Sequence, residues 1–265
     1  MLKSLTESSL KRFFNEIYHI LRETDTNLIE IWCELSKLSR LAKMNNFELK
    51  EFLTNFRFIS IKKGNYINYI VINKILFIIE SINFLRSDIK KVSEIIDYNG
   101  FESLIKEILS VHNYNCIKNF RFSDKSNFKT KTSQKRYEID IIALYLKYIL
   151  LIDAKQWRRR DSYRSLNKAA NLQCRRAIIL KNNPEILSEL IQKLRGKGLN
   201  YKIKLPLLII PVMVTLEDNG IKINESQIPL VSIYELNSFI RELHNNLEYF
   251  RIIKISKLSI QKTLF

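Results

Sequence analysis

The sequence is poor in the residues that build several common kinds of site. It has only 3 cysteines among 265 residues, Cys33, Cys116 and Cys174, and no two of them stand in a C-x-x-C pair. Structural zinc sites draw on such closely spaced ligands, so the spacing argues against one. Because the cysteine count is odd and no secretory signal is evident, we expect a reducing, cytoplasmic location.

Long apolar runs are also missing. A membrane-spanning helix needs roughly 20 consecutive apolar residues. The richest stretch, residues 69–85 (YIVINKILFIIESINFL), is interrupted by Asn73, Lys74, Glu80 and Asn83. It is typical of a buried helix in a protein with no membrane partner. There is no internal repeat and no low-complexity linker, so the length fits one large domain or two smaller ones.

Acidic residues are scarce relative to basic ones. The chain has 44 Lys and Arg against 27 Asp and Glu, a net charge of +17. Such an excess indicates a polyanionic partner, either nucleic acid or an anionic membrane surface. No basic helix with a clear apolar face stands out, which favours nucleic acid. A compositional bias toward Ile, Asn and Lys is the alternative explanation.

The first 97 residues are predicted to form a mainly helical domain. Residues 10–23 (LKRFFNEIYHILRE) carry apolar side chains at helical spacing, and residues 27–44 (NLIEIWCELSKLSRLAKM) continue that pattern. β-branched and aromatic residues on both sides of Gly64 predict a short hairpin, followed by a helix over 71–85. Ser87 is a plausible N-cap of a further helix. This arrangement is compatible with a winged-helix module and equally with a plain helical cap.

From residue 98 onward the sequence predicts an α/β domain that extends to residue 265. Apolar spacing and β-branched runs predict helices at 101–112, 162–182, 184–196 and 234–247, and strands at 114–122, 205–216 and 228–233. Two more strands fall within residues 136–157. This order predicts one mixed central sheet flanked by helices.

Residues 136–157 (RYEIDIIALYLKYILLIDAKQW) are the most informative stretch. Strand side chains alternate between faces, so Tyr137 to Ala143 and Tyr148 to Ala154 place eight apolar residues on one face, which we expect to be the core face. The other face carries Ile142 and Leu151 together with the charged residues Glu138, Asp140, Asp153 and Lys155. The charges gather at the end away from the turn.

The hairpin register brings two carboxylates together. With Leu146 and Lys147 at the tip, Asp140 lies opposite Asp153, and directly opposed residues have β-carbons about 4.5–5.5 Å apart. Like charges this close need a cation or a shared proton, and Lys155 offsets only one of them. Carboxylate oxygens without His or Cys favour Mg²⁺ or Mn²⁺. A surface hairpin with cross-strand ion pairs is the alternative.

Asp140 followed by Asp153-Ala154-Lys155 after an apolar strand resembles the motif of the PD-(D/E)xK nuclease superfamily. The run FE…EID…LLIDAKQW is especially similar to its archaeal Holliday-junction-resolvase and Mrr-type restriction-endonuclease branches. The resemblance covers residues 98–245 and implies a restriction-endonuclease-like fold. It also implies a metal site of Asp140, Asp153 and Glu102, with Lys155 orienting the attacking water. Asp153 departs from these branches, which more often have Glu.

Three further residues are candidate auxiliaries. Gln156 follows the motif lysine, and Gln173 on the next helix would either reach the site or be solvated. Glu138 shares the site face, as a second metal ligand or as an outer residue paired with Lys or Arg. The segments flanking the hairpin are strongly basic, which suits sequence-independent binding of a phosphate backbone. The candidate nucleic-acid contacts are Lys129, Lys131, Lys135, Arg136, Arg158, Arg159, Arg160, Arg164, Arg175 and Arg176.

These features together predict a metal-dependent DNA endonuclease that acts on duplex or branched DNA, as in DNA repair or restriction. Two alternatives stay open: an RNA nuclease with the same site, and an inactive nuclease-like protein that only binds nucleic acid. Cutting both strands of a duplex usually needs two active sites, so a homodimer is expected.

Overall fold

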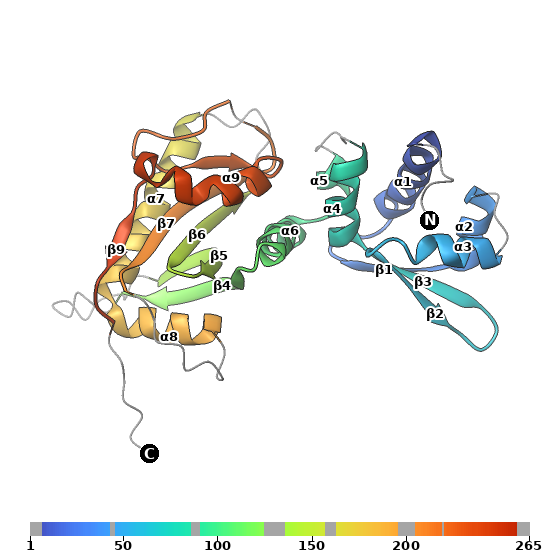
Figure 1. Ribbon diagram of the computed structural model, residues 1–265, viewed down its shortest axis with the longest axis horizontal. Helices are drawn as coiled ribbons and strands as arrows, with labels where there is room; N and C mark the ends of the chain where they lie inside the picture. The colour runs from blue at the N-terminus through green and yellow to red at the C-terminus, as the bar shows by residue number, and fades with distance from the viewer. Residues whose placement is uncertain are drawn as a thin grey trace, which may run out of the picture. The chain divides into compact units, whose positions relative to one another are not determined.

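The computed structural model describes residues 7–42, 46–85, 91–124, 136–156, 163–195, 205–218 and 220–258. The chain divides into two compact units, Met1–Leu104 and Ile105–Phe265, and the division falls within helix α6 (Tyr98–Val111). Figure 1 shows the elements of both units.

The N-terminal unit combines helices with a small antiparallel sheet. Its elements in chain order are α1 (Glu7–Arg22), β1 (Glu30–Glu34), α2 (Leu35–Ala42), α3 (Asn46–Leu53), β2 (Ile59–Lys63), β3 (Asn68–Asn73), α4 (Lys74–Leu85) and α5 (Val92–Ile95). The three strands lie in the order β1-β3-β2. The winged-helix interpretation stays a prediction, and Ser87 lies outside the described residues.

The predicted hairpin around Gly64 is confirmed as β2 and β3. The Gly64 amide donates to the Ile67 carbonyl at 3.0 Å, and a β-carbon on Gly64 would come within 2.4 Å of that oxygen. The prediction of a continuous helical pattern over 27–44 is wrong at its start, since Glu30–Glu34 is a strand paired with β3. In it, buried Ile31 alternates with exposed Trp32, so tertiary pairing decided between two patterns that the sequence allowed.

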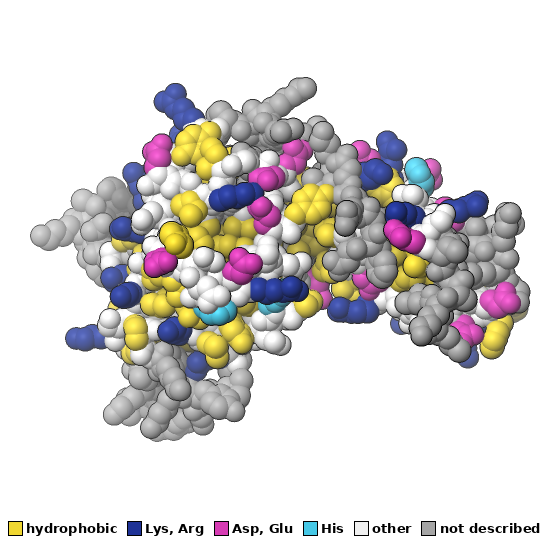
Figure 2. All heavy atoms as spheres, turned by 45° about the horizontal axis from the view of Figure 1, so that its top comes forward, with side chains coloured by type: hydrophobic (Ala, Val, Ile, Leu, Met, Phe, Trp, Pro, Cys, Tyr) yellow, Lys and Arg dark blue, Asp and Glu magenta, His cyan; other side chains and the backbone are white. Residues whose placement is uncertain are grey.

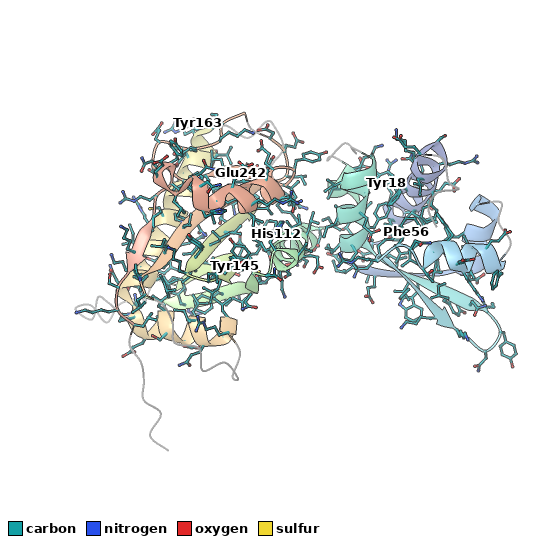
Figure 3. The ribbon with its side chains drawn as sticks, viewed as in Figure 1. Tyr18, Phe56, His112, Tyr145, Tyr163 and Glu242 are labelled. Atoms are coloured by element: carbon teal, nitrogen blue, oxygen red, sulfur yellow. The ribbon has the colours of Figure 1, made fainter. Side chains whose placement is uncertain are left out.

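Aromatic side chains fill the core of this unit. The apolar face of α1 supplies Phe13 and Phe14. Their rings meet Phe52 of α3, Phe56 and Phe58 of the turn between α3 and β2, and Phe77 of α4. Most of these contacts are edge-to-face or tilted, the arrangements that aromatic rings prefer. Figure 3 labels Phe56 within this cluster. The helical spacing read from residues 10–23 is therefore a core-facing stripe.

The C-terminal unit is built on one mixed sheet, as predicted. After α6 come β4 (Asn115–Ser123), β5 (Arg136–Tyr145), β6 (Tyr148–Lys155), α7 (Tyr163–Asn182), α8 (Pro184–Arg195), β7 (Leu207–Thr215), β8 (Leu230–Ser232), α9 (Leu236–Glu242), two 3₁₀ turns (Leu243–Asn245 and Leu247–Tyr249) and β9 (Ile253–Ile255). The order is β4-β5-β6-β7-β8, with β9 also on β7. Strand β7 runs parallel to β6 and β8, and the other pairings are antiparallel.

Helices α7 and α8 cover one face of this sheet, and α7 passes behind the strands in the view of Figure 1. All nine residues of β7 are buried, which confirms it as a central strand. No helix among the described residues is long and apolar enough to cross a membrane.

The prediction that only one face of the β5–β6 hairpin is a core face is wrong. Ile142 and Leu151 were placed on the charged face, yet both are fully buried in the cluster beneath α7 and α8. That cluster also contains Ile139, which strict alternation would put on the opposite face from Ile142. This departure from strict alternation in β5 lies beside an irregularity in the neighbouring strand. Asn119 of β4, opposite Asp140, has a left-handed φ of 54°, which interrupts the extended backbone there.

Candidate functional site

The β5–β6 hairpin has the predicted tip and register. Leu146 and Lys147 form the turn, with Leu146 at φ 53°, and the ladder runs from Tyr145 opposite Tyr148 to Ile141 opposite Ile152. Asp140 and Asp153 are the next residues along the two strands beyond that last pair. Asp140 and Asp153 therefore lie at the same level along the two strands.

Asp140 is tied directly to the neighbouring strand. Its Oδ2 accepts a hydrogen bond of 2.9 Å from the backbone amide of Ala154, the residue that follows Asp153. Asp140 itself is half-buried. This bond fixes the Asp140 carboxylate beside the first residue of the Asp-x-Lys motif.

Asp153 is the buried centre of the site, with only 2% of its surface exposed. Its Oδ1 accepts a 2.8 Å hydrogen bond from Nη1 of Arg176 on α7. Its Oδ2 lies 3.0 Å from Nζ of Lys155, as an ion pair without hydrogen-bond geometry. This burial rules out the surface hairpin considered from the sequence, because Asp153 is enclosed between the sheet and α7.

Helix α7 contributes a second layer to the site. Nη1 of Arg176 also donates to Oε1 of Gln173 at 2.9 Å, and Gln173 is fully buried. The interpretation of Gln173 as a solvated helical residue is therefore wrong. Its Nε2 has no hydrogen-bond partner among the described residues. Buried donors are rarely left unpaired, so this amide is suited to an oxygen atom of a bound ligand.

The sequence contained a signal for the placement of Gln173. The buried residues of α7 are Leu166, Ala170, Gln173, Ala177 and Leu180, which form one helical stripe. Gln173 is the polar member of that stripe, and Arg176 stands beside it near Ala177. Composition alone could not separate Arg176 from its exposed neighbour Arg175, because both are arginines in a basic segment.

The remaining candidate residues have the following positions. Glu138 forms an exposed 3.1 Å ion pair with Arg121, which confirms the outer, paired position and raises the pKa of Arg121 through its hydrogen bond. Gln156 is half-buried just past the end of β6. Glu102 is a buried carboxylate of α6 in the N-terminal unit.

Two carboxylate side chains of the site carry the kind of oxygen donor that a hard metal ion takes. Asp140 and Asp153 offer the carboxylate oxygens that Mg²⁺ and Mn²⁺ prefer, and Oδ2 of Asp153 accepts no hydrogen bond. Within the described parts of the chain, no group of three or more His, Cys, Asp or Glu has the arrangement of a metal site. The donor chemistry fits a hard divalent ion held by these two carboxylates, with the rest of its ligands from water or substrate.

The net positive charge belongs almost wholly to the C-terminal unit. Residues 1–104 have 15 Lys and Arg against 13 Asp and Glu, a net +2, whereas residues 105–265 have 29 against 14, a net +15. On the face drawn in Figure 2, the Lys and Arg side chains of this unit are dispersed among apolar and acidic ones. The excess of basic residues therefore lies in the same unit as Asp140 and Asp153, and the N-terminal unit is close to neutral.

The predicted nucleic-acid contacts are only partly described. Arg136 on β5 and Arg164 and Arg175 on α7 are exposed, and α7 begins at Tyr163, labelled in Figure 3. Arg176 is turned toward Asp153. The other predicted contacts lie outside the described residues: Lys129, Lys131, Lys135, Arg158, Arg159 and Arg160.

Comparison with known proteins gives no family. No family model matches the chain, and no curated protein is similar to it. Among solved structures, protein VC1899 from Vibrio cholerae is similar at a TM-score of 0.34 and 14% identity. The alignment covers 92% of this chain and 53% of that protein, so the chain spans about half its length. A likeness this weak carries no argument about fold or function.

Proposed function

We propose that the protein is a metal-dependent nuclease that hydrolyses phosphodiester bonds in duplex or branched DNA. One observation carries the proposal: in the more basic of the two units, the Ala154 amide donates a hydrogen bond to Asp140, and the preceding residue, Asp153, forms an ion pair with Lys155. The resemblance of Asp140 and Asp153-Ala154-Lys155 to the PD-(D/E)xK motif supports the same reading, as does the mixed sheet flanked by helices.

Each side chain has a distinct role in this proposal. Asp140 and Asp153 hold Mg²⁺ or Mn²⁺, and Glu102 is the third ligand implied by the resemblance. When bound, such an ion lowers the pKa of a water molecule and stabilises charge on the phosphate. Lys155, 24% exposed and 3.0 Å from Asp153, orients the attacking water or offsets the charge that develops in the transition state.

Binding of the substrate is proposed to be electrostatic. Exposed Arg136, Arg164 and Arg175 neutralise phosphates in a sequence-independent manner. Each phosphate contact contributes about 0.9 to the slope of log affinity against log salt concentration. Replacing Arg164 and Arg175 together should therefore reduce that slope by about 2, and an unchanged slope would remove them from the substrate path.

The alternatives share this site and differ in outcome. An RNA nuclease would cleave RNA in preference to DNA, and an inactive nuclease-like protein would bind without cleaving. A cytoplasmic location, supported by three free cysteines, and a homodimer belong to the proposal as well. Sedimentation with and without DNA tests the dimer.

The deciding experiment compares cleavage by the wild type with cleavage by Asp153→Asn and Lys155→Ala. Linear, nicked, flapped and four-way DNA, and RNA, are incubated with Mg²⁺, Mn²⁺ or EDTA. Glu138→Gln is the matched control, because it removes one carboxylate from the same hairpin at an exposed position paired with Arg121. We expect cleavage by the wild type and Glu138→Gln only. Binding without cleavage of any substrate would favour the inactive protein.

A further inference from the structure

Arg176 has a place in the site that nucleic-acid binding does not explain. Its guanidinium is largely buried, with 17% of the side chain exposed, and one nitrogen bonds both Asp153 and Gln173. The adjacent Arg175 is exposed on the same helix. Two neighbouring arginines thus have different environments, and Arg176 is the one that donates a hydrogen bond to a site carboxylate.

Among the described residues of the C-terminal unit, two site carboxylates and two cationic side chains are close together. Asp140 and Asp153 contribute two negative charges, and Lys155 and Arg176 contribute two positive ones. A divalent cation placed between the carboxylates adds two positive charges to these four groups, and the one further negative charge of Glu102 does not offset both. Charge without a counter-charge is costly in a partly buried site. A phosphodiester supplies negative charge at the same place, so its presence favours the cation.

We propose that Arg176 is a positioning residue that holds Asp153 through Oδ1 and makes binding of the divalent cation depend on a bound phosphodiester. This inference rests on the proposed function, because it assumes that Asp140 and Asp153 hold the cation. Such coupling is reciprocal, so the cation strengthens binding of the nucleic acid by the same factor. The protein then assembles its site only on its substrate.

Gln173 stabilises this arrangement from the helix. Its Oε1 accepts from the same Arg176 nitrogen that contacts Asp153, so it holds the guanidinium toward the sheet. Its fully buried Nε2 lacks a hydrogen-bond partner among the residues described. An amide donor next to this charge cluster suits an oxygen of the incoming phosphate. Gln173 therefore serves both the guanidinium and the ligand.

The test is calorimetric titration of Mn²⁺ into the full chain, alone and with a phosphorothioate DNA duplex that resists cleavage. We expect Mn²⁺ to bind the wild type about tenfold more tightly when the duplex is present, within the usual range of coupling between sites. Arg176→Met should bind Mn²⁺ more tightly than the wild type without DNA, and the effect of the duplex should fall below about threefold. Arg176→Lys keeps the charge and should retain most of the coupling.

Arg175→Met is the matched control, since it removes the same charge one residue away. This variant should keep the coupling between Mn²⁺ and DNA, and it should bind the duplex more weakly in a salt-dependent manner. Gln173→Glu provides a second route if Arg176→Met does not fold: its carboxylate pairs with Arg176, so Mn²⁺ should bind more tightly without DNA.

The inference is overturned if folded Arg176→Met, or Gln173→Glu in its place, has the Mn²⁺ affinity and coupling of the wild type. It is also overturned if the wild type binds Mn²⁺ equally well with and without DNA. In those cases DNA cleavage by the wild type would leave the proposed function standing. A wild type that binds no Mn²⁺ under either condition contradicts both.

Discussion

The backbone amide of Ala154 donates a 2.9 Å hydrogen bond to Oδ2 of Asp140. This contact joins β5 to β6 just beyond the last pair of their ladder, Ile141 and Ile152. It links the position of one site carboxylate to the backbone next to the other. The hairpin and the site are consequently one structural unit, and changes at Asp140 separate its structural role from its chemical one.

Asp140→Asn and Asp140→Ala should differ in stability and agree in activity. The asparagine side-chain oxygen can still accept the hydrogen bond from the Ala154 amide, so we expect a free energy of unfolding close to that of the wild type. Alanine leaves the amide without its acceptor, at a cost of about 1–3 kcal/mol. Neither variant should cleave DNA. Urea denaturation measures the difference, and a fully active Asp140→Asn would show that the charge is dispensable.

Asp153→Asn should destabilise the folded protein by about 3 kcal/mol, because it leaves Lys155 and Arg176 without their shared carboxylate in a mostly buried position. Adding Arg176→Met should recover part of this loss, since the two changes remove both members of the pair. A double-mutant cycle of unfolding free energies provides the measurement. Additive effects would mean that Asp153 and Arg176 do not interact in solution.

Leu151→Ala tests the burial of both faces of the hairpin. Leu151 lies fully buried under α7 and α8, so the substitution should cost about 2–5 kcal/mol. The same substitution on a solvated face would lower the free energy of unfolding by less than about 1 kcal/mol. Thermal or urea unfolding distinguishes the two values, and the smaller one would restore the single-core-face prediction.

Two thiols should stay protonated in the folded protein at neutral pH, and their ionisation at high pH should lower the stability of the fold. Burial raises the pKa of Cys116 and of Cys33 to about 11, and Lys106 and Lys37 oppose this only in part. Unfolded thiols ionise near pH 8.5, so the folded state retains these protons longer. Their contribution to stability is complete below about pH 8.5 and is lost as pH rises toward 11.

Alkylation with iodoacetamide at pH 8, followed by peptide mapping, checks the protection directly. Cys33 and Cys116 should react slowly in the folded protein and quickly in denaturant, because the thiolate is the reactive form. Equal rates in the two states would contradict the burial of these thiols.

Much of the C-terminal unit was predictable because its signals are local. The tip and register of the β5–β6 hairpin, the central strand β7 and helices α7 and α8 follow from short patterns of apolar residues. The motif likewise grouped Asp140, Asp153 and Lys155. In the structure Asp140 accepts from the Ala154 amide and Lys155 pairs with Asp153, while their role as a site stays a prediction.

The errors arose where distant contacts decide the outcome. Glu30–Glu34 fits a helical pattern, and only pairing with β3 makes it a strand. The three residues of β9 are too few to show a period, and they pair with β7 from the far end of the chain. Coverage by α7 and α8 buries a face that alternation marked as charged. The contact of Arg176 with Asp153 needs the rotation of α7 about its axis, which its charge does not encode.

The central claim is that Asp140, Asp153 and Lys155 form a nuclease site. Its most direct test is cleavage of plasmid DNA by the full chain with Mg²⁺ or Mn²⁺. The account predicts cleavage that EDTA abolishes and that persists in Glu138→Gln. The rate should fall at least about a hundredfold in Asp153→Asn and in Lys155→Ala, which is typical of lost transition-state stabilisation. Cleavage that survives EDTA or both site substitutions would contradict it.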